Sequence, residues 1–480
     1  WTSDGKDAFT IAPAERETHG TSVVLHLKQE HRQYTGTWQL KDLVERYSDY
    51  ISHPIQMLTQ PAPGSEDEPA PAPGFETVNQ ASALWQRSSD DITDEQYDEF
   101  YKHLTHDWEA PLDRAHFRIE GTQLFTGLLF VPKRPPFGLY DPDAKHGVRL
   151  HVKRVFIMDN CEDLLPRWLR FMRGVIDSDD LDLNVSREML QDSRLVRVMR
   201  KQVVKKSLDL FERIAADRPE DYTDLWTHYG TILKEGLHFD PDYKDRLAGL
   251  VRFQSSRNEG LTSLAEYVER MPEDQPAIYY AIGPSRDQLE ASPHLEVLKA
   301  KEWEILYMVD TIDEWALRVL QEFDEKRLVS ATEAELDLGE DKAEDESEEE
   351  DVELSELRTR IADVLSDNVS EVRVSKRLSD SPACLVTPSG RMNAHIEAVL
   401  RANGQDVPKS KRIFEINPNH ALITGLENVR EKSPGSEAIQ EWIELLYDQA
   451  VLAEGMPLEN PARLASRMTR LMQSAIEAGA

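Results

Sequence analysis

The sequence has few cysteines and no long apolar run. Only Cys161 and Cys384 occur in 480 residues, which excludes a disulfide framework and favours a reducing cytoplasm. Neither has the Cys or His neighbours of a metal site, so both are expected to be ordinary thiols and no metal site is expected. No stretch approaches the roughly 18 apolar residues that span a bilayer, and no basic and apolar leader is seen. A cytoplasmic protein is therefore expected.

Basic residues are also in short supply. Lys and Arg number 56 against 89 Asp and Glu, a formal net charge of −33. A field of this sign disfavours nucleic acid and anionic membranes as partners. The basic helix expected over 194–206 has no interleaved aromatic residues, which favours a solvated face over a nucleic-acid site. Ten acids and one lysine lie between Glu340 and Glu353, and this tract is expected to be a solvated linker.

The length and composition predict a multidomain α/β protein. A chain of 480 residues is too long for one hydrophobic core. Residues 60–76 hold five prolines and two glycines with acids between them, which predicts a semi-extended linker. The expected parts are an N-terminal remnant (1–57), a Pro-rich linker (58–80), a middle domain (81–338, with a large α/β part 81–216, a helical part 217–272 and a small α/β part 273–338), an acidic linker (339–353) and a C-terminal domain (354–480).

Hydrophobic periodicity predicts the elements of the first half. Residues 8–11 and 21–27 alternate as strands do, and resemble the last two strands of a sheet whose other strands are missing. A helix is expected over 38–51, ended by His53-Pro54. Strands are expected over 122–132 and 149–158. Two helices with apolar faces are expected, one over 162–176 (Leu165, Trp168, Leu169, Met172, Ile176) and a long one from Ser186 (Val196, Met199, Val203, Leu210, Ile214).

A short β/α segment and a terminal helical hairpin follow. Residues 277–283 and 303–309 are expected to be strands and 313–323 a helix. Ser436 can cap a helix that carries Ile439, Trp442, Ile443, Leu446 and Val451, and Asn460 with Pro461 can start another with Leu464, Met468, Leu471 and Met472. Two terminal amphipathic helices have little remaining sequence to cover them. Pairing with the same hairpin of a second copy, as a four-helix bundle, is one solution; packing on their own domain is the other.

One charged residue stands in an unusual place. Ser186 is a good N-cap, which puts Arg187 in the first helical turn, where a cation opposes the helix dipole at a cost of about 0.3 to 1 kcal/mol. Arg187 can simply pair with an acid such as Asp192. Alternatively, an arginine at a loop-to-helix junction can reach a terminal phosphate supplied by another domain.

Several strings in this order resemble one family. NVSREMLQ (184–191), and the segment 155–183 before it, resemble the middle domain of the ninety-kilodalton heat-shock chaperone family. Further matching strings are ALWQR and ITDEQYDEFYK within 83–102, VPKRPPFGLYD (131–141), SPHLEVLKAKEWEILYMVDTIDEW (292–315) and IFEINPNHALI (413–423). They run in family order from one end of the chain to the other, so chance is a poor explanation.

The resemblance implies roles for particular residues. It implies that Arg187 contacts the ATP γ-phosphate and that Gln191 belongs to the same catalytic loop. Phe137, in the RPPF string, matches an apolar contact that helps to position this loop; the alternative, an ordinary buried aromatic, is compatible with that role. Thr21 matches a threonine near the adenine, and this role rests wholly on the family.

The resemblance also implies partners. Trp315 and a second stretch, Met392, Ile396 and Leu400, match the apolar surface that binds partly folded client proteins, and core packing is the alternative for each. The family forms homodimers through its C-terminal hairpin. The ending SAIEAGA lacks the Met-Glu-Glu-Val-Asp tail and the Lys-Asp-Glu-Leu signal of other members, which favours a bacterial cytoplasmic protein.

The family's ATP pocket is mostly missing from these 480 residues. The implied fold starts with a remnant of a GHKL-type α/β sandwich and ends in an α+β dimerisation domain. The family binds ATP with Mg²⁺ through a Glu/Asn helix, an Asp-x-Gly-x-Gly motif and a glycine-rich lid. No Asp-x-Gly-x-Gly string occurs here, so these groups are expected to precede Trp1. The intact protein is expected to be an ATP hydrolase and this chain to be inactive alone.

Two alternatives stay open. The chain can be a nucleotide-independent holdase or dimeric scaffold. DNA-acting relatives such as gyrase and the mismatch-repair proteins share the ATPase fold, but they present a lysine from the second domain, and the acidic field disfavours DNA. An ATP-driven, dimeric folding chaperone is the reading that the sequence favours.

Overall fold

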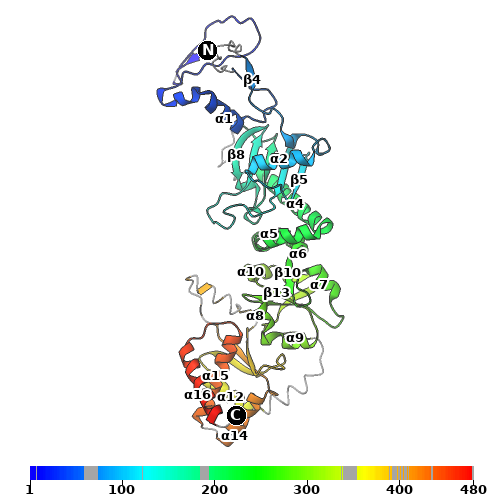
Figure 1. Cartoon of the computed structure of the whole chain (residues 1–480), viewed down its shortest axis with the longest axis vertical. Coiled ribbons are helices and arrows are strands. Elements are labelled where there is room, and N and C mark those ends of the chain that lie inside the picture. The colour runs from blue at the N-terminus through cyan, green and yellow to red at the C-terminus, as the bar shows by residue number, and fades with distance from the viewer. Residues whose placement is uncertain are drawn as a thin grey trace, which may run out of the picture.

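The computed structural model is elongated, with its sheets and helical layers arranged one after another along a single axis (Figure 1). The N-terminal segments lie at one end and the C-terminal helices at the other. The structure describes residues 1–480 except 7, 59–73, 122, 184–193, 337, 339–353, 389, 392–396, 398–399, 402–403, 405–407, 409, 434–435 and 478–480. The architecture is mixed α/β, as expected. The domain boundaries drawn from the sequence remain a prediction.

The N-terminal segment has little regular structure. Strands β1 (Thr2–Ser3) and β2 (Phe9–Thr10) form a two-stranded ladder, and a 3₁₀ turn η1 (Gln29–Thr35) precedes α1 (Thr37–Tyr47). The strand predicted over 21–27 is wrong: this stretch is irregular and its apolar side chains are exposed. Alternation marks one side of a strand, but a strand also needs a hydrogen-bonding neighbour, and no described residue supplies one. The helix predicted over 38–51 ends early, at Tyr47.

Two short strands flank the proline-rich segment. β3 (Gln56–Leu58) pairs antiparallel with β4 (Phe75–Thr77), with Leu58 opposite Phe75. Next to this ladder, Asn79 bonds three backbone groups: its Oδ1 accepts the N–H of Ile55 at 2.7 Å, and its Nδ2 donates to the carbonyls of Ile51 and His53 at 3.2 and 3.0 Å. The strands thus hold the residues that flank 59–73 side by side.

The residues around Tyr50 attach this region to the next sheet. Tyr50 is buried, with its ring centroid 4.7 Å from that of Trp85. The Asp49 carboxylate accepts the N–H of Gln80 at 2.9 Å, and its carbonyl accepts that of Ala81 at 3.0 Å. Burial raises the pKa of Asp49. Contacts to the five-stranded sheet therefore begin before the proline-rich segment.

A five-stranded sheet forms the large α/β layer, in the order β5-β6-β9-β7-β8. All neighbours are antiparallel except β7 and β9. Helix α2 (Asp94–Thr105) begins at a capping box in which Thr93 and Gln96 each bond the other's backbone N–H. The predicted strand 122–132 is confirmed, and 149–158 is a hairpin rather than one strand. The strands are β5 (Asp113–Ile119), β6 (Phe125–Val131), β7 (Val148–Val152), β8 (Val155–Cys161) and β9 (Arg173–Ser178).

The helix predicted over 162–176 is wrong. The segment forms two 3₁₀ turns, η4 (Glu162–Leu164) and η5 (Arg167–Leu169), and then enters β9. Pro166 has no N–H to donate and disfavours helical geometry at the residue before it. The five apolar residues predicted to face the core are all buried. Their burial was predicted correctly, but their helical spacing was coincidental.

Three helices connect this sheet to the next. The predicted long helix is confirmed from Arg194 on, as α4 (Arg194–Asp217), and its five predicted core residues are buried; its predicted start over 186–193 lies outside the described residues. It packs on α5 (Pro219–Phe239) and α6 (Lys244–Leu250). The rings of Phe171 and Tyr229 stack at 4.1 Å between centroids, which joins the sheet to α5. One hydrophobic core runs through these helices into the following sheet.

A six-stranded mixed sheet follows, in the order β11-β10-β13-β12-β15-β14. The predicted strands 277–283 and 303–309 are confirmed as β12 and β13, which pair in parallel. The predicted helix 313–323 is only five residues long (α10), because the chain turns into β14. The strands are β10 (Arg252–Ser255), β11 (Leu261–Ser263), β12 (Ile278–Ile282), β13 (Ile305–Met308), β14 (Glu322–Phe323) and β15 (Lys326–Ser330); the helices are α7 (Leu264–Arg270), α8 (Arg286–Glu290), α9 (Glu296–Ala300) and α10 (Asp313–Leu317), with 3₁₀ turns at Leu84–Gln86, Ser89–Asp91, Pro241–Tyr243 and Pro293–Leu295.

The C-terminal part is a three-stranded sheet covered by helices. The order is β16-β18-β17, with β18 parallel to β16 and antiparallel to β17. The predicted hairpin is confirmed as α15 and α16, and Asn460 caps α16 by accepting the N–H of Arg463 at 3.0 Å. Ser436 precedes α15 without a side-chain cap. The elements are β16 (Val369–Val374), β17 (Ala383–Val386), β18 (Arg412–Ile416), α12 (Ser355–Val364), α14 (Ala421–Lys432), α15 (Glu437–Ala453) and α16 (Pro461–Glu477).

None of the helices in the described part of the chain is long and apolar enough to cross a membrane.

The paired ends of 59–73 give a testable prediction. Replacing 59–73 by Asn-Gly is expected to leave amide hydrogen exchange in 49–58 unchanged, because the new turn keeps β3 and β4 paired. Asn79→Ala is expected to speed exchange there by about tenfold or more, because three backbone groups lose their partner. Exchange measured by mass spectrometry checks both. Faster exchange in the loop replacement would contradict this prediction, and so would an unchanged exchange rate in Asn79→Ala.

Candidate functional site

Arg187 and Gln191 lie outside the described residues, but the residues on both sides of them are described. At the end of β9, Ser178 Oγ accepts the N–H groups of Asp180 and Leu181 at 3.3 and 3.2 Å. Asp180 in turn accepts the N–H of Leu124 at 2.6 Å. On the far side, α4 begins at Arg194. This segment therefore lies in the sequence between the end of a central strand and the described start of the longest described helix.

Phe137 is fully exposed, in a turn between β6 and β7. The prediction allowed for a buried aromatic, and the structure excludes that reading. Arg170 connects this turn to α5. Its Nε donates to the carbonyl of Leu139 at 3.0 Å, and its Nη1 and Nη2 form a bidentate pair with Glu235 on α5 at 2.6 and 2.9 Å. Such a pair fixes geometry as well as charge. An exposed aromatic side chain thus stands on a rigid base.

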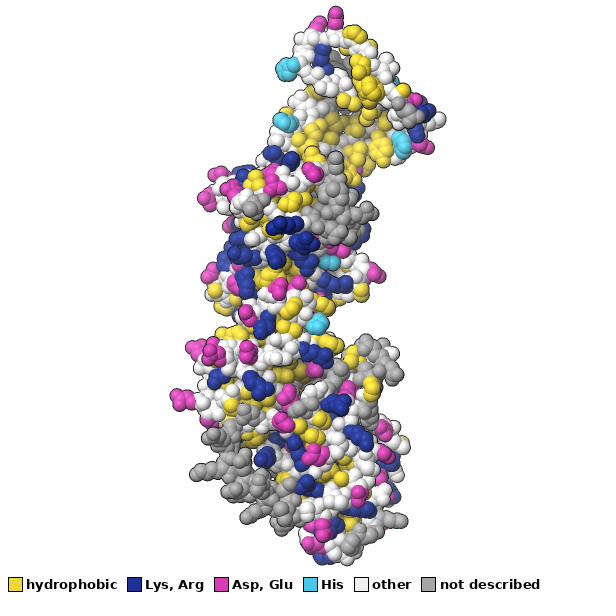
Figure 2. Space-filling view, turned by 180° about the vertical axis from the view of Figure 1, so that it is seen from behind, with side chains coloured by type: hydrophobic (Ala, Val, Ile, Leu, Met, Phe, Trp, Pro, Cys, Tyr) yellow, Lys and Arg dark blue, Asp and Glu magenta, His cyan; other side chains and the backbone are white. Residues whose placement is uncertain are grey.

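The recess beside Phe137 has more cations than acids in its lining, with Asp141 as its one carboxylate. It is lined by Lys145, His146, Arg167, Arg170 and Arg173 as well as by the turn itself. Burial lowers the pKa of His146, and the three arginines lower it further against the opposing effect of Glu162. Burial also lowers the pKa of Arg173. In a chain of net charge −33, a local excess of cations on the large α/β layer is a feature that can attract an anion. Figure 2 shows Lys and Arg side chains gathered over the middle of the molecule.

Thr21 is exposed and lies in the irregular N-terminal stretch. No described residue forms a binding pocket around it. Its neighbours Val23, Val24 and Leu25 are about three-quarters exposed (75–77%), and Figure 2 shows apolar side chains uncovered at this end of the molecule.

Trp315 lies on α10 and is half-buried. Its ring centroid is 5.7 Å from that of His238, and the Arg318 guanidinium lies 4.6 Å from the ring centroid. Next to His238, Phe239 is 64% exposed and contacts the His238 ring. Trp315 and Phe239 therefore both lie against the His238 ring, and together the two side chains form an aromatic surface.

A buried lysine anchors the helix of Trp315. Lys234, on α5, is 3% exposed and lies 2.8 Å from Asp310 and 2.7 Å from Asp313. Burial alone would lower the pKa of Lys234, but the two carboxylates raise it above its ordinary value. An ionised lysine held by two aspartates fixes α10 against α5. Lys234 was not singled out in the sequence, because a lysine in a helical pattern normally indicates a solvated position.

The second predicted client stretch is only partly described. Met392 and Ile396 lie outside the described residues, and Leu400 is half-buried. Between them, Glu397 is buried and its carboxylate lies 3.0 Å from Arg412 on β18. This pair attaches the stretch to the three-stranded sheet. The exposed stripe expected from the sequence is left untested.

The helical hairpin has one covered and one uncovered apolar face. The α15 residues Ile439, Ile443 and Leu446 are buried against the three-stranded sheet. Along α16, Leu464 is buried, but the later apolar residues are exposed: Met468, Leu471, Met472 and Ile476. Arg467 ties the two helices by pairing with Glu444 and Asp448. These four apolar side chains lie at helical spacing along α16, so they share one face of the helix.

Among the described residues, no group of three or more His, Cys, Asp or Glu side chains is placed to hold a metal ion. The two cysteines are both buried, and burial raises the pKa of the Cys384 thiol.

Comparison with known proteins gives the family. A sequence model of the family described as Hsp90 protein matches residues 71–480. The chain is 54% identical over 475 residues to the chaperone protein HtpG of Myxococcus xanthus, covering 98% of this chain and 72% of that protein. It is 45% identical to the HtpG of Bordetella avium (98% and 75% covered) and 44% identical to that of Mycobacterium tuberculosis (98% and 76% covered). The chain therefore belongs to the Hsp90 family of molecular chaperones.

Proposed function

We propose that the protein is an ATP-dependent chaperone that binds partly folded proteins as a homodimeric clamp. The observation that carries this proposal is the collinear similarity to HtpG chaperones over 98% of the chain, which includes the string around Arg187 and the helix of Trp315. The acidic field keeps such a protein soluble while it exposes apolar surface, and the cytoplasm is the proposed location.

In the proposed ATPase site, this chain supplies residues that contact the nucleotide, while most of the nucleotide pocket of the family is not among the 480 residues. Arg187 is proposed to donate to γ-phosphate oxygens, with Gln191 in the same loop, because a planar guanidinium can stabilise charge that develops on the transferred phosphoryl group. Phe137 stands on the rigid base beside a basic recess, which supports its role in positioning that loop. Thr21 remains a proposed adenine contact. The Mg²⁺ ligand of the family is not among the described residues, and no step is assigned to the metal.

Client binding is proposed for the aromatic surface of Trp315, extended by Phe239. Exposed aromatic side chains bury much area at little conformational cost, which suits a surface that must accept many unfolded sequences. Met392, Ile396 and Leu400 are proposed as a second patch. The exposed row Met468, Leu471 and Met472 is proposed as the dimer contact, because a C2 interface lets the same row cover itself.

A nucleotide-independent holdase is the second candidate. It is favoured by one observation: the 480 residues contain apolar surfaces but no Asp-x-Gly-x-Gly motif. The two candidates differ in whether nucleotide changes the activity of the protein.

The ATPase proposal predicts a defect confined to turnover. In the full-length protein, Arg187→Ala is expected to lower kcat by at least about tenfold while ATP affinity stays within about twofold, because the arginine acts on charge that develops in the transition state. Arg194→Ala, at the exposed start of α4, is the matched control and is expected to turn over normally. Steady-state phosphate release and a nucleotide-binding titration give both values. Unchanged turnover in Arg187→Ala would remove it from the mechanism.

The dimer proposal predicts a selective loss of association. Met468→Glu is expected to weaken the dimer by about 100-fold, because a carboxylate would be buried without a partner in an apolar contact. Ser466→Glu, exposed on the same helix, adds the same charge outside the row and should remain dimeric. Sedimentation across a range of concentrations measures both. If the two variants have the same dimer dissociation constant, the proposed interface is wrong.

A further inference from the structure

The turn that carries Phe137 presents two uncovered aromatic rings. Phe137 is fully exposed, and Tyr140 in the same turn is 65% exposed. The N–H of Asp141 donates to the carbonyl of Gly138 at 2.9 Å, which closes the turn, and Arg170 connects the turn to α5. The two rings therefore stand on a fixed backbone, where they are accessible to another molecule.

Three cations line the recess beside Phe137, and none of them forms an ion pair with a carboxylate of the described residues. They are Lys145, Arg167 and Arg173. Asp141 is the one carboxylate in the lining, and the remaining arginine there, Arg170, already pairs with Glu235. The recess therefore keeps a net positive charge, in a chain whose net charge is −33.

Arg173 is the least exposed of these three cations. Lys145 and Arg167 are exposed, whereas Arg173 is half-buried. Its Nη1 donates to the carbonyls of Arg170 and Met172, both at 2.9 Å, which satisfies one nitrogen but leaves the charge without a counterion. Burial accordingly lowers the pKa of Arg173. An anion that reaches this guanidinium would offset the cost of its desolvation.

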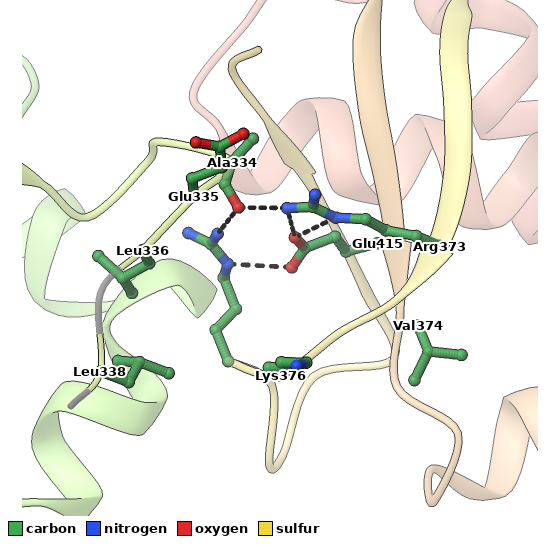
Figure 3. Close-up of a pocket in the computed structure, with 9 residues that line it drawn as sticks. Ala334, Glu335, Leu336, Leu338, Arg373, Val374, Lys376 and Glu415 are labelled. Atoms are coloured by element: carbon green, nitrogen blue, oxygen red, sulfur yellow. Dashed lines mark hydrogen bonds and ion pairs between the residues drawn. The ribbon is translucent and has the colours of Figure 1, made fainter. Parts of the chain in front are cut away.

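The arginines of a second cavity are satisfied within the protein. Glu415, which lines that cavity, is 2% exposed and accepts from Arg377 Nε at 2.9 Å and from Arg373 at 2.9 and 2.6 Å. Figure 3 shows Arg373 and Glu415 facing each other there. Arg377 also donates to the carbonyls of Ala331 and Glu333, both at 2.6 Å. Because these donors are already used, this cavity is a weaker candidate for binding an anion than the recess beside Phe137.

The size of the recess limits what can enter it. Its volume is about 20 Å³, which is room for about one water-sized group. Only the end of a ligand can therefore enter, while the rest of the ligand stays outside, next to the exposed rings. A side-chain carboxylate meets this limit, because it can place one oxygen in the recess and its planar shape matches a guanidinium.

We propose that Phe137, Tyr140, Arg167 and Arg173 form a docking surface for a partner protein that presents an acidic side chain beside an apolar one. The carboxylate pairs with Arg173 in the recess, and the apolar side chain packs on Phe137. Aromatic residues and arginine are the residue types that contribute most at protein interfaces. The acidic remainder of the chain repels such a segment, which favours this surface over others.

The test is a binding titration with a short acidic peptide and the full chain, without nucleotide, so that its result does not depend on the proposed ATPase activity. The probe is fluorescein-labelled Gly-Ser-Leu-Glu-Leu-Ser-Gly, and its match has Gln in place of Glu. Fluorescence anisotropy is expected to show about tenfold tighter binding of the Glu peptide, because a charge-assisted pair is stronger than a neutral hydrogen bond. Arg173→Met is expected to abolish this preference, whereas Phe137→Ala should weaken both peptides by the same factor.

Arg118→Met is the matched control. Arg118 is an exposed arginine on β5 of the same sheet, but it already pairs with Glu120 at 2.7 Å, so its loss should leave both affinities unchanged. If Arg173→Met fails to fold by circular dichroism, the exposed Arg167→Ala replaces it with the same expectation. The proposal is overturned if the unmodified chain does not bind the Glu peptide or binds both peptides equally, or if the preference for Glu persists in the folded variant.

Discussion

Buried backbone groups at the crossings between sheets are the constraint on which this structure depends. A chain that forms successive sheets along one axis (Figure 1) must repeatedly leave one ladder and enter another. At each crossing, carbonyl and N–H groups are buried without the partners that a strand interior supplies. Asn79 satisfies three such groups at the first crossing, and Arg377 satisfies three at the last. Single polar side chains thus determine whether neighbouring layers stay in register.

The middle of the chain uses a different solution. There the layers are joined by apolar core, which runs from the five-stranded sheet through α4–α6 to Leu306 and Met308. Within this core, the buried Lys234 pairs with Asp310 and Asp313. A buried ion pair adds little net stability, but separating its partners leaves a buried charge without a partner and is strongly destabilising. The pair therefore fixes the position of α10 and of Trp315. The aromatic surface proposed for client binding is thereby supported by a fixed helix.

Sequence patterns predicted the parts of the fold that obey local rules. The stripe of α4 and the strands β12 and β13 were predicted from periodicity and length, and the cap of α16 from Asn460-Pro461; the parallel pairing of the two strands was not predicted. The segment 162–176 could not, because Pro166 breaks a pattern that otherwise fits a helix. The strand prediction for 21–27 was wrong because a strand needs a hydrogen-bonding neighbour, and the local pattern does not show whether one is present.

The candidate site was predictable only through the family resemblance. Arg187 stood out as a cation in a first helical turn, but its role came from the matching string. Phe239, Lys234 and Arg377 were missed, because nothing in the spacing of a single Lys or Arg indicates that it will be buried among carbonyls or carboxylates. Phe137 shows the limit of hydrophobicity as a guide: the residue is apolar, and yet it is fully exposed on a rigid turn.

The central claim is that this chain holds partly folded proteins on the surface of Trp315. Light scattering from a thermally unfolding client tests it most directly, with the chain, Trp315→Ala and the control Trp38→Ala, which removes an exposed tryptophan from α1. The account predicts that the chain and Trp38→Ala suppress aggregation and that Trp315→Ala needs about threefold more protein for the same effect. Equal suppression by all three, or none by the chain itself, would contradict it.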